Sequence, residues 1–309
     1  MPTYRVPAST TNLGHGFDCL GIALGLANHI AITPGFAEVI APDAADAGLQ
    51  PMAERVRAAC AQAWGVSIPG FAVRVTGEVP IARGMGSSAT SLCGVAAACR
   101  ELAGLPDDAG AVLEIAAAIE GHPDNVAAAV LGGVTVVGSF GGAVSGTVSG
   151  AVSGAISGRL QWAKIEVPTS LTAVVAIPPF EVKTSEARKI LPQELSRSEA
   201  IRGLQRTALI TAALAQGRPA DLRGLFADAW HEQFRAPLNP GFVEARAAAD
   251  AAGAVGTIIS GSGSTVLSFA PVAQAAAIRA AVEASYRQRG VMAEVRIVAF
   301  DNGGLTRLG

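Results

Sequence analysis

The apolar and polar positions along the chain follow two spacings, and the changes between them predict an alternation of strands and helices. The segment F-A-V-R-V-T is typical of a half-buried strand, whereas polar residues gather on one side of a predicted helix over Met52–Trp64. The first half is predicted to contain four strands and three helices: strands over Tyr4–Pro7, 20–33, Phe71–Thr76 and Leu131–Phe140, and helices over Met52–Trp64, Ser87–Ala103 and Asp107–Glu120.

The second half of the chain shows the same mixture. Its predicted strands are Leu171–Ile177, Met292–Ala299 and two that flank the glycines of TIISGSGSTVLSF, and its predicted helices are Ser198–Gln216, Pro219–His231, Gly241–Ala252 and Val272–Gln288. Because strands and helices occur together in both halves, the sequence predicts an α+β fold.

One long stretch, Asn125–Gly158, carries no charge. It consists largely of Gly, Ser and Ala, whereas a membrane-spanning helix needs about 20 predominantly apolar residues, so we expect a buried strand followed by a loop. The loop contains a four-residue repeat, GAVS, GTVS, GAVS and GAIS, over Gly142–Ser157. No side chain of such a repeat can fix a strand register. Its position near mid-chain predicts a boundary between two domains, 1–165 and 166–309.

The composition narrows the function. The 309 residues carry a net charge of −2 and are 50% hydrophobic, which excludes general disorder and argues against nucleic-acid binding by bulk charge. Of the 23 basic residues only three are lysines, Lys164, Lys183 and Lys189. None follows a glycine, so a Walker A phosphate loop is excluded. The four cysteines form no CxxC pair and no apolar leader opens the chain, so we expect reduced thiols and a cytoplasmic protein.

A glycine-rich turn opens the helix predicted from Ser87. It reads Gly84-Met-Gly-Ser-Ser-Ala89, and the free N–H groups of such a helix start favour an anion. A dinucleotide-binding loop has a similar spacing, but its strand should run directly into the first glycine, and Gly77-Glu-Val-Pro80 interrupts it. The chain has no GxSxG turn of the kind used by α/β-hydrolases.

Three segments together resemble the GHMP kinase superfamily. The segment Pro80–Ala89 is similar to its PxxxGxGSSA phosphate loop, and Pro7–Asp18 and Ser260–Thr265 are similar to its first and third motifs. Within the superfamily the chain resembles the homoserine kinases, through Glu120–Ala127, Lys183–Pro192 and His231–Pro237. The resemblance covers the chain except for the GxVS repeat.

This resemblance implies an N-terminal half like ribosomal protein S5 and a ferredoxin-like C-terminal half. It implies ATP-dependent phosphorylation of the hydroxyl of L-homoserine to O-phospho-L-homoserine, in threonine biosynthesis, with Mg²⁺. The implied partners are ATP and L-homoserine, without nucleic acid or membrane, in a homodimer. Two alternatives stay open: a GHMP kinase for another small carboxylated alcohol, and a non-catalytic protein of this fold that senses its ligand.

The resemblance also assigns the nucleotide and metal sites. The expected nucleotide-binding residues are Pro80, Arg83, Gly84, Met85, Gly86, Ser87, Ser88 and Ala89. Ser88 and Glu114 match the metal ligands, and Glu114 lies in the apolar run LEIAAAIE, where an unpaired carboxylate would be costly. Thr184 matches a hydroxyl near the γ-phosphate.

The implied acceptor, homoserine, is a zwitterion, so its binding site needs both a positive and a negative side chain. Arg188 and Arg235 match the carboxylate-binding positions, because guanidinium binds carboxylate through two hydrogen bonds, and Asp18 matches the group that binds the ammonium. The polar residues expected to line this pocket are Asn12, His122 and Asn125.

The expected catalytic residues are Ser88, Glu114, Asp124, Asn125 and Thr184. Asp124 aligns with an aspartate that some superfamily members use as a base, whereas homoserine kinases are thought to depend on transition-state stabilisation.

The chain also departs from the family pattern in two places. Ser264 stands where the third motif usually has proline, and Leu49-Gln50-Pro51 stands where an asparagine near the adenine is common, which leaves the adenine contacts unassigned.

Overall fold

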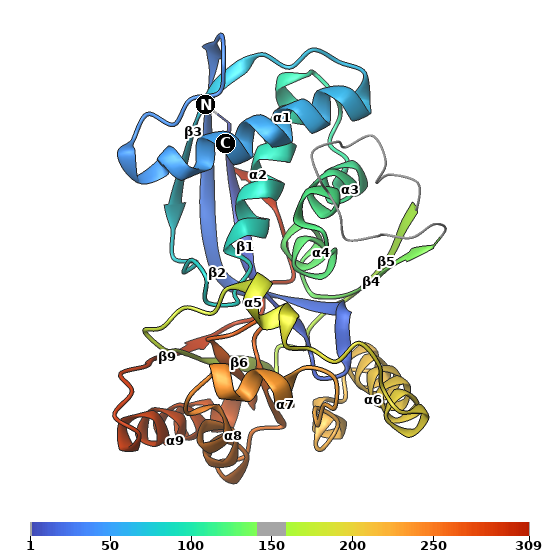
Figure 1. Cartoon of the computed structure of the whole chain (residues 1–309), viewed down its shortest axis with the longest axis vertical. Coiled ribbons are helices and arrows are strands. Elements are labelled where there is room, and N and C mark those ends of the chain that lie inside the picture. The colour runs from blue at the N-terminus through green and yellow to red at the C-terminus, as the bar shows by residue number, and fades with distance from the viewer. Residues whose placement is uncertain (1, 141–158, 309) are drawn as a thin grey trace.

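A computed structural model describes residues 2–140 and 159–308 and divides into an upper and a lower part (Figure 1). The upper part is a six-stranded sheet in the order β10-β1-β2-β4-β5, with β3 paired to β2. Its strands are β1 (Thr3–Asn12), β2 (Gly16–Phe36), β3 (Gly70–Gly77), β4 (Val134–Phe140), β5 (Arg159–Ile165) and β10 (Thr306–Leu308).

Four helices cover one face of this sheet: α1 (Gln50–Trp64), α2 (Ser87–Leu102), α3 (Ala109–Glu120) and α4 (Asp124–Leu131). Helices α2 and α4 pack directly on β1 and β2, and α1 and α3 pack on α2. Helix α2 is rich in Ala, Ser and Cys and is buried over most of its length, which lets it lie between the sheet and two other helices.

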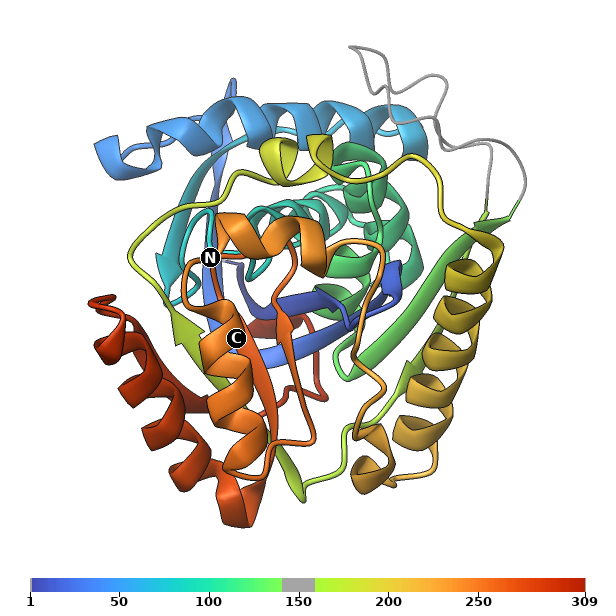
Figure 2. The same ribbon diagram turned by 60° about the horizontal axis from the view of Figure 1, so that its bottom comes forward.

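The lower part is a four-stranded antiparallel sheet in the order β7-β8-β6-β9. Its strands are β6 (Leu171–Ile177), β7 (Gly256–Ile259), β8 (Val266–Pro271) and β9 (Glu294–Val298), and its two covering helices are α8 (Phe242–Ala251) and α9 (Ala275–Gln288). The chain order β6-α8-β7-β8-α9-β9 gives the ferredoxin-like arrangement. Figure 2 shows the orange and red helices α8 and α9 side by side on one face.

The two faces of this lower sheet pack differently. Val174 and Ala176 of β6 lie in a core with α8 and α9, whereas Ala173 and Val175 lie in a second core with Leu20 from β2. Strand side chains alternate between faces, so one apolar strand can serve both cores. The β1–β2 hairpin contributes to the cores of both parts and joins them.

Most expected elements are present, but several parts of the chain differ from the expectation. The expected helix Pro219–His231 is wrong: it is only a 3-10 turn, Pro219–Leu222, followed by loop and the short helix α7 (Glu232–Arg235). Helix α4 was not expected, and neither was β5. The polar segment after Pro7 is not only turn, because β1 continues through it to Asn12.

The remaining helices are α5 (Thr184–Lys189) and α6 (Arg197–Ala215). None of the helices in the described part of the chain is long and apolar enough to cross a bilayer. The Gly142–Ser157 repeat lies outside the described residues. Strand β10 returns to pair with β1, so the end of the chain joins the first sheet, and the proposed boundary near 165 stays a prediction.

Candidate active site

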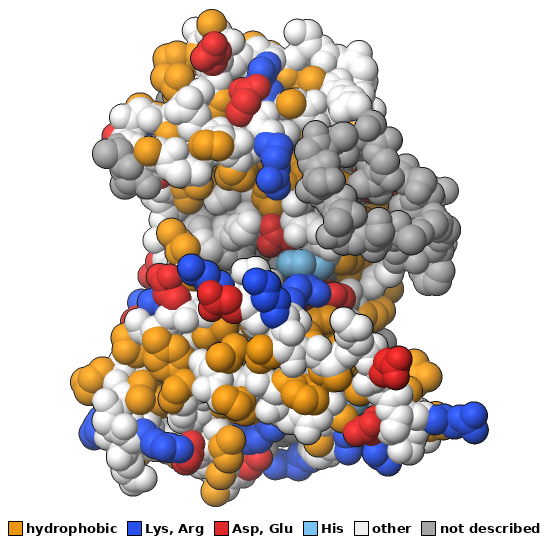
Figure 3. All heavy atoms as spheres, in the orientation of Figure 1, with side chains coloured by type: hydrophobic (Ala, Val, Ile, Leu, Met, Phe, Trp, Pro, Cys, Tyr) orange, Lys and Arg blue, Asp and Glu red, His pale blue; other side chains and the backbone are white. Residues whose placement is uncertain are grey.

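A cavity of about 370 Å³ lies between the two parts of the molecule. Figure 3 shows a waist at this level, where basic side chains and a histidine gather. The cavity is lined by these expected residues: Asn12, Asp18, Pro80, Arg83, Gly84, Met85, Gly86, Ser87, Ser88, His122, Asp124, Asn125, Thr184, Arg188 and Arg235. Segments from five regions of the sequence therefore meet at one site. Two expected residues, Ala89 and Glu114, do not line it.

The glycine-rich turn is held tightly at the start of α2. Gly84 and Gly86 both have positive φ, 72° and 70°, which favours glycine. The carbonyl of Gly84 accepts a hydrogen bond from Ser260 Oγ at 2.7 Å, and the carbonyl of Met85 accepts one from the backbone N–H of Ser9 at 3.1 Å. The first N–H groups of α2 have no side-chain cap, so this end of the cavity is suited to phosphate.

This geometry makes Gly86 a sensitive position. A Cβ atom there would lie 2.2 Å from Ser9 Oγ, and the left-handed backbone would add roughly 1–2 kcal/mol of strain. We expect Gly86→Ala to raise the KM for ATP about 10-fold, the factor that 1.4 kcal/mol produces.

Gly104 offers a matched control for this change. Its φ of 67° is similar, but a Cβ atom would meet nothing within 4 Å. Gly104→Ala should therefore share the strain, visible as a lower melting temperature, without changing the KM for ATP. Equal KM values for the two variants would contradict the tight fit of the phosphate turn.

The carboxylate nearest the turn is one that sequence reasoning did not assign. Ser88 Oγ donates a hydrogen bond of 2.8 Å to Glu120 Oε2 at the end of α3, and both residues line the cavity. Glu114 lies on the same helix about 120° further round its axis, because each residue advances about 100°. The structure therefore places Glu120, and not Glu114, against Ser88. Glu120 belongs to the motif Glu120-Gly-His-Pro-Asp124, which could have drawn attention to it. The spacing along the helix did not show which of the two glutamates faces the cavity.

Ser88 and Glu120 present the hard oxygen donors that Mg²⁺ prefers. Among residues 2–140 and 159–308, no three carboxylate, histidine or cysteine side chains converge into a metal site. These two residues fit a metal that takes its other ligands from phosphate and water.

Also lining the cavity, Arg188 and Asp18 form an ion pair with two hydrogen bonds, of 2.9 and 2.6 Å. Each side chain is about one-third exposed, 36% and 34%, so a ligand can reach both charges. Asp18 lies just after the β1–β2 turn and Arg188 lies on α5. The pair thus brings together two distant parts of the chain.

Arg235 is buried close to this pair. It donates to the carbonyl of Ala187 at 3.2 Å and to that of Gly261 at 2.8 Å, and none of its hydrogen bonds in the described chain goes to a carboxylate. Burial, with the neighbouring charge of Arg188, lowers the pKa of Arg235 to about 10, so it stays charged at neutral pH. A buried cation of this kind favours an incoming anion.

Phe17 contacts both arginines, and sequence reasoning missed it. The guanidinium carbons of Arg188 and Arg235 lie 5.2 and 5.3 Å from the centre of its ring, within the range of a cation–π contact. Trp230 stacks on the same ring at 6.0 Å. The Phe17 ring is therefore a common packing partner of both cations.

His122, Asp124 and Asn125 form a polar group at the start of α4. Asp124 is buried; it accepts from the backbone N–H of Asn125 at 2.8 Å and faces His122 Nδ1 at 3.2 Å. Asn125 also contacts Ser9 and Thr11 on β1. Burial alone would lower the pKa of His122 and raise that of Asp124, but each partner outweighs it, so the histidine pKa is raised and the aspartate pKa is lowered.

This pair gives stability a defined pH dependence. The contribution of His122 to the free energy of unfolding is complete below its unfolded pKa of about 6.5, and it is lost as the pH rises through the raised pKa of the folded state. The contribution of Asp124 is present above its unfolded pKa of about 3.9, and it is lost as the pH falls through the lowered pKa of the folded state. We therefore expect wild type to exceed His122→Asn in melting temperature by on the order of 2–4 °C near pH 6, the shift from about 1 kcal/mol. Thermal denaturation at several pH values should show the gap narrowing toward pH 9. A gap that widens there would contradict the assignment.

Comparison with known proteins agrees with this architecture. The model of the GHMP kinases N terminal domain matches residues 51–133 and that of the GHMP kinases C terminal domain matches 210–288, so the chain is a GHMP kinase. It is 38% identical to the homoserine kinase of Trichormus variabilis over 98% of both chains, and 38% identical to that of Deinococcus radiodurans over 86% of this chain and 83% of that one. The chain therefore belongs to the homoserine kinase family.

A solved structure shows the same fold. The homoserine kinase of Cytophaga hutchinsonii superimposes with a TM-score of 0.84 over 99% of this chain and 97% of that one, at 24% identity. The L. major mevalonate kinase in complex with R-mevalonate superimposes with a TM-score of 0.66, over 97% of this chain and 96% of that one, at 15% identity. The two-domain GHMP kinase fold expected from the sequence is confirmed.

Proposed function

We propose that this kinase transfers the γ-phosphoryl group of ATP to the hydroxyl of L-homoserine and forms O-phospho-L-homoserine. The observation that carries the proposal is that one cavity is lined both by a turn suited to phosphate and by the charges that an amino-acid site needs. Full-length similarity to homoserine kinases supports the same acceptor.

The acceptor end suits a zwitterion. The ammonium of homoserine would bind Asp18 and its carboxylate would bind Arg188 and Arg235, so each partner of the existing ion pair meets an opposite charge. Arg235, which is bonded only to carbonyls in the described chain, supplies the cation that no protein carboxylate neutralises. Asn12, His122 and Asn125 line the rest of this pocket.

The donor end suits a nucleoside triphosphate. The N–H groups at the start of α2 would bind its phosphate oxygens, and Thr184, the first residue of α5, lines the same cavity. Ser88 and Glu120 would hold Mg²⁺, which when bound neutralises developing phosphate charge. We propose Glu120 for the role that the family resemblance gave to Glu114.

Asp124 is poorly suited to act as a base. Its carboxylate is already engaged by His122 and by the backbone of Asn125, and its lowered pKa makes it a weak proton acceptor. We infer that Asp124 orients His122 and Asn125, while positioning and charge neutralisation lower the barrier. The homodimer, which the resemblance implies, and the cytoplasmic location both stay predictions.

An ADP-release assay tests this function directly. With Mg·ATP and a panel of homoserine, mevalonate, galactose and shikimate, homoserine should give the highest kcat/KM. Turnover of another carboxylated alcohol in preference to homoserine would show a different acceptor. Binding of homoserine without turnover of any acceptor would indicate a ligand sensor.

A further inference from the structure

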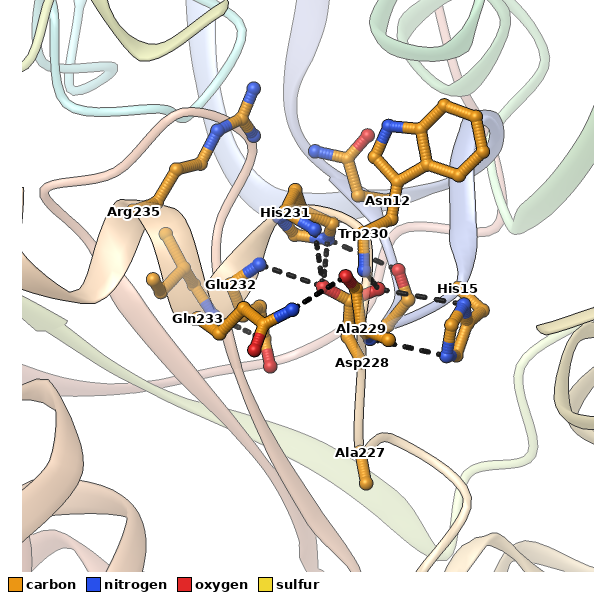
Figure 4. Close-up of polar contacts among 12 residues, drawn as sticks. Asn12, His15, Ala227, Asp228, Ala229, Trp230, His231, Glu232, Gln233 and Arg235 are labelled. Carbon is orange, nitrogen blue, oxygen red and sulfur yellow. Dashed lines mark hydrogen bonds and ion pairs between the residues drawn. The ribbon is translucent and has the colours of Figure 1, made fainter. Parts of the chain in front are cut away.

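A buried carboxylate outside the cavity holds the loop that carries Arg235. The Asp228 side chain is fully buried, although it lies in a segment of irregular structure. Its Oδ2 accepts hydrogen bonds from the backbone N–H groups of His231 at 2.6 Å and Glu232 at 2.7 Å, and its Oδ1 accepts one from Trp230 at 3.0 Å. Figure 4 shows these N–H groups directed at a single carboxylate.

These bonds hold the start of the short helix that carries Arg235. Helix α7 has only four residues, and a single helical turn is unfavourable without outside support. The residue that precedes it, His231, makes no side-chain cap, so Asp228 takes that role from three residues earlier. Arg235 is the last residue of the same turn and moves with it.

Two histidines connect this carboxylate to the β1–β2 turn. His15 Nε2 accepts from the backbone N–H of Ala229 at 3.3 Å, so its proton lies on Nδ1, which is 3.6 Å from Asp228 Oδ1. His231 Nε2 lies 3.1 Å from the carbonyl of Gly14 and, because a carbonyl only accepts, must be the donor. The residues after this turn include Phe17 and Asp18, which form the other side of the amino-acid site.

The network therefore spans both sides of the acceptor pocket. The Phe17 ring lies 5.5 Å from the ring of His231 and contacts Arg235, so the packing continues from the network into the site. Asp228 does not line the cavity, and the N–H groups that it binds, those of Trp230, His231 and Glu232, precede or open the helix that carries Arg235. The phosphate turn, in contrast, is held by Ser9 and Ser260.

We propose that Asp228 is a positioning residue that fixes the spacing between Arg235 and the Phe17–Asp18 segment, and so sets the affinity and selectivity for the amino-acid head of the acceptor. The proposal rests on the proposed function, because it assumes that these charges bind homoserine. In this proposal, a residue outside the cavity determines how well the kinase distinguishes acceptors with a carboxylate from acceptors without one.

Asp228→Asn tests the role with little change in volume. One carboxylate oxygen becomes an NH₂ group, which cannot accept from a backbone N–H. We expect the KM for homoserine to rise about 10-fold, equivalent to about 1.4 kcal/mol, with the KM for ATP within about twofold and kcat within about threefold of wild type. The exposed Asp221, in the same segment and paired with Arg218 at 3.2 Å, provides the control Asp221→Asn, which should leave all three constants unchanged.

A second acceptor separates positioning from general damage to the fold. The compound 3-aminopropan-1-ol has the hydroxyl and ammonium of homoserine but lacks its carboxylate. Asp228→Asn should lower the preference for homoserine over this amine, measured as the ratio of kcat/KM values, whereas general destabilisation would lower both values equally. His15→Asn, which removes the bond to Ala229, should lower the same ratio by a smaller factor and serves if Asp228→Asn folds poorly.

The outcomes are distinguishable. A wild-type protein that does not phosphorylate homoserine contradicts the proposed function. An active wild type, with Asp228 and His15 variants that keep the same acceptor ratio and the same KM for homoserine, contradicts the positioning role alone.

Discussion

Glu120→Gln should lower kcat roughly 100-fold or more, the size of effect seen when one electrostatic partner of a charged transition state is removed. The side chain keeps its shape and its hydrogen bond from Ser88, but it loses the charge that would hold a divalent cation. Steady-state ADP release at increasing Mg²⁺ concentration measures both the loss of kcat and a higher Mg²⁺ requirement.

Glu114→Gln is the matched control, because it makes the same chemical change on the same helix. Glu114 is half-buried and does not line the cavity, so we expect kcat to stay within about twofold of wild type, as for most surface changes. If Glu114→Gln were the variant that lost activity, the family alignment would be right and the assignment of Glu120 would be wrong.

Arg235→Ala should raise the KM for homoserine about 100-fold, because truncating one partner of a buried charge pair costs on the order of 2–5 kcal/mol. The KM for ATP should change little, since the phosphate turn is held by other contacts. Initial rates with each substrate varied in turn separate the two constants.

Arg235→Lys refines this result. It keeps the positive charge but loses the planar fork that binds Ala187, Gly261 and a carboxylate together, so its KM for homoserine should lie between those of wild type and alanine. Arg279→Ala, on the exposed face of α9, controls for loss of a cation and should have no effect on KM. A change of less than threefold in Arg235→Ala would contradict its role in binding the carboxylate.

Local patterns predicted the regular elements because neighbouring residues decide them. Strand β6 was predicted with its observed bounds, Leu171–Ile177, and α2 was predicted to within one residue from the glycines before it and Gly104 after it. The expected helix Pro219–His231 is wrong because side chains in this segment bond backbone groups outside it: Asp228 accepts from the N–H of Glu232, which opens α7, and Arg223 donates to the distant carbonyls of Gly253 and Ala254.

The amino-acid sequence alone determined the class of protein, the phosphate turn and the residue types of the site, because the motifs that identify them are short continuous segments that occur in a fixed order. Only the tertiary structure decided that Glu120 rather than Glu114 faces Ser88, since that depends on how α3 is rotated against α2. It alone showed that Phe17 contacts both Arg188 and Arg235, and that buried Asp228 holds the turn before Arg235. The contacts of Ser88 with Glu120 and of Phe17 with the arginines join residues far apart in the chain, and no local spacing encodes them.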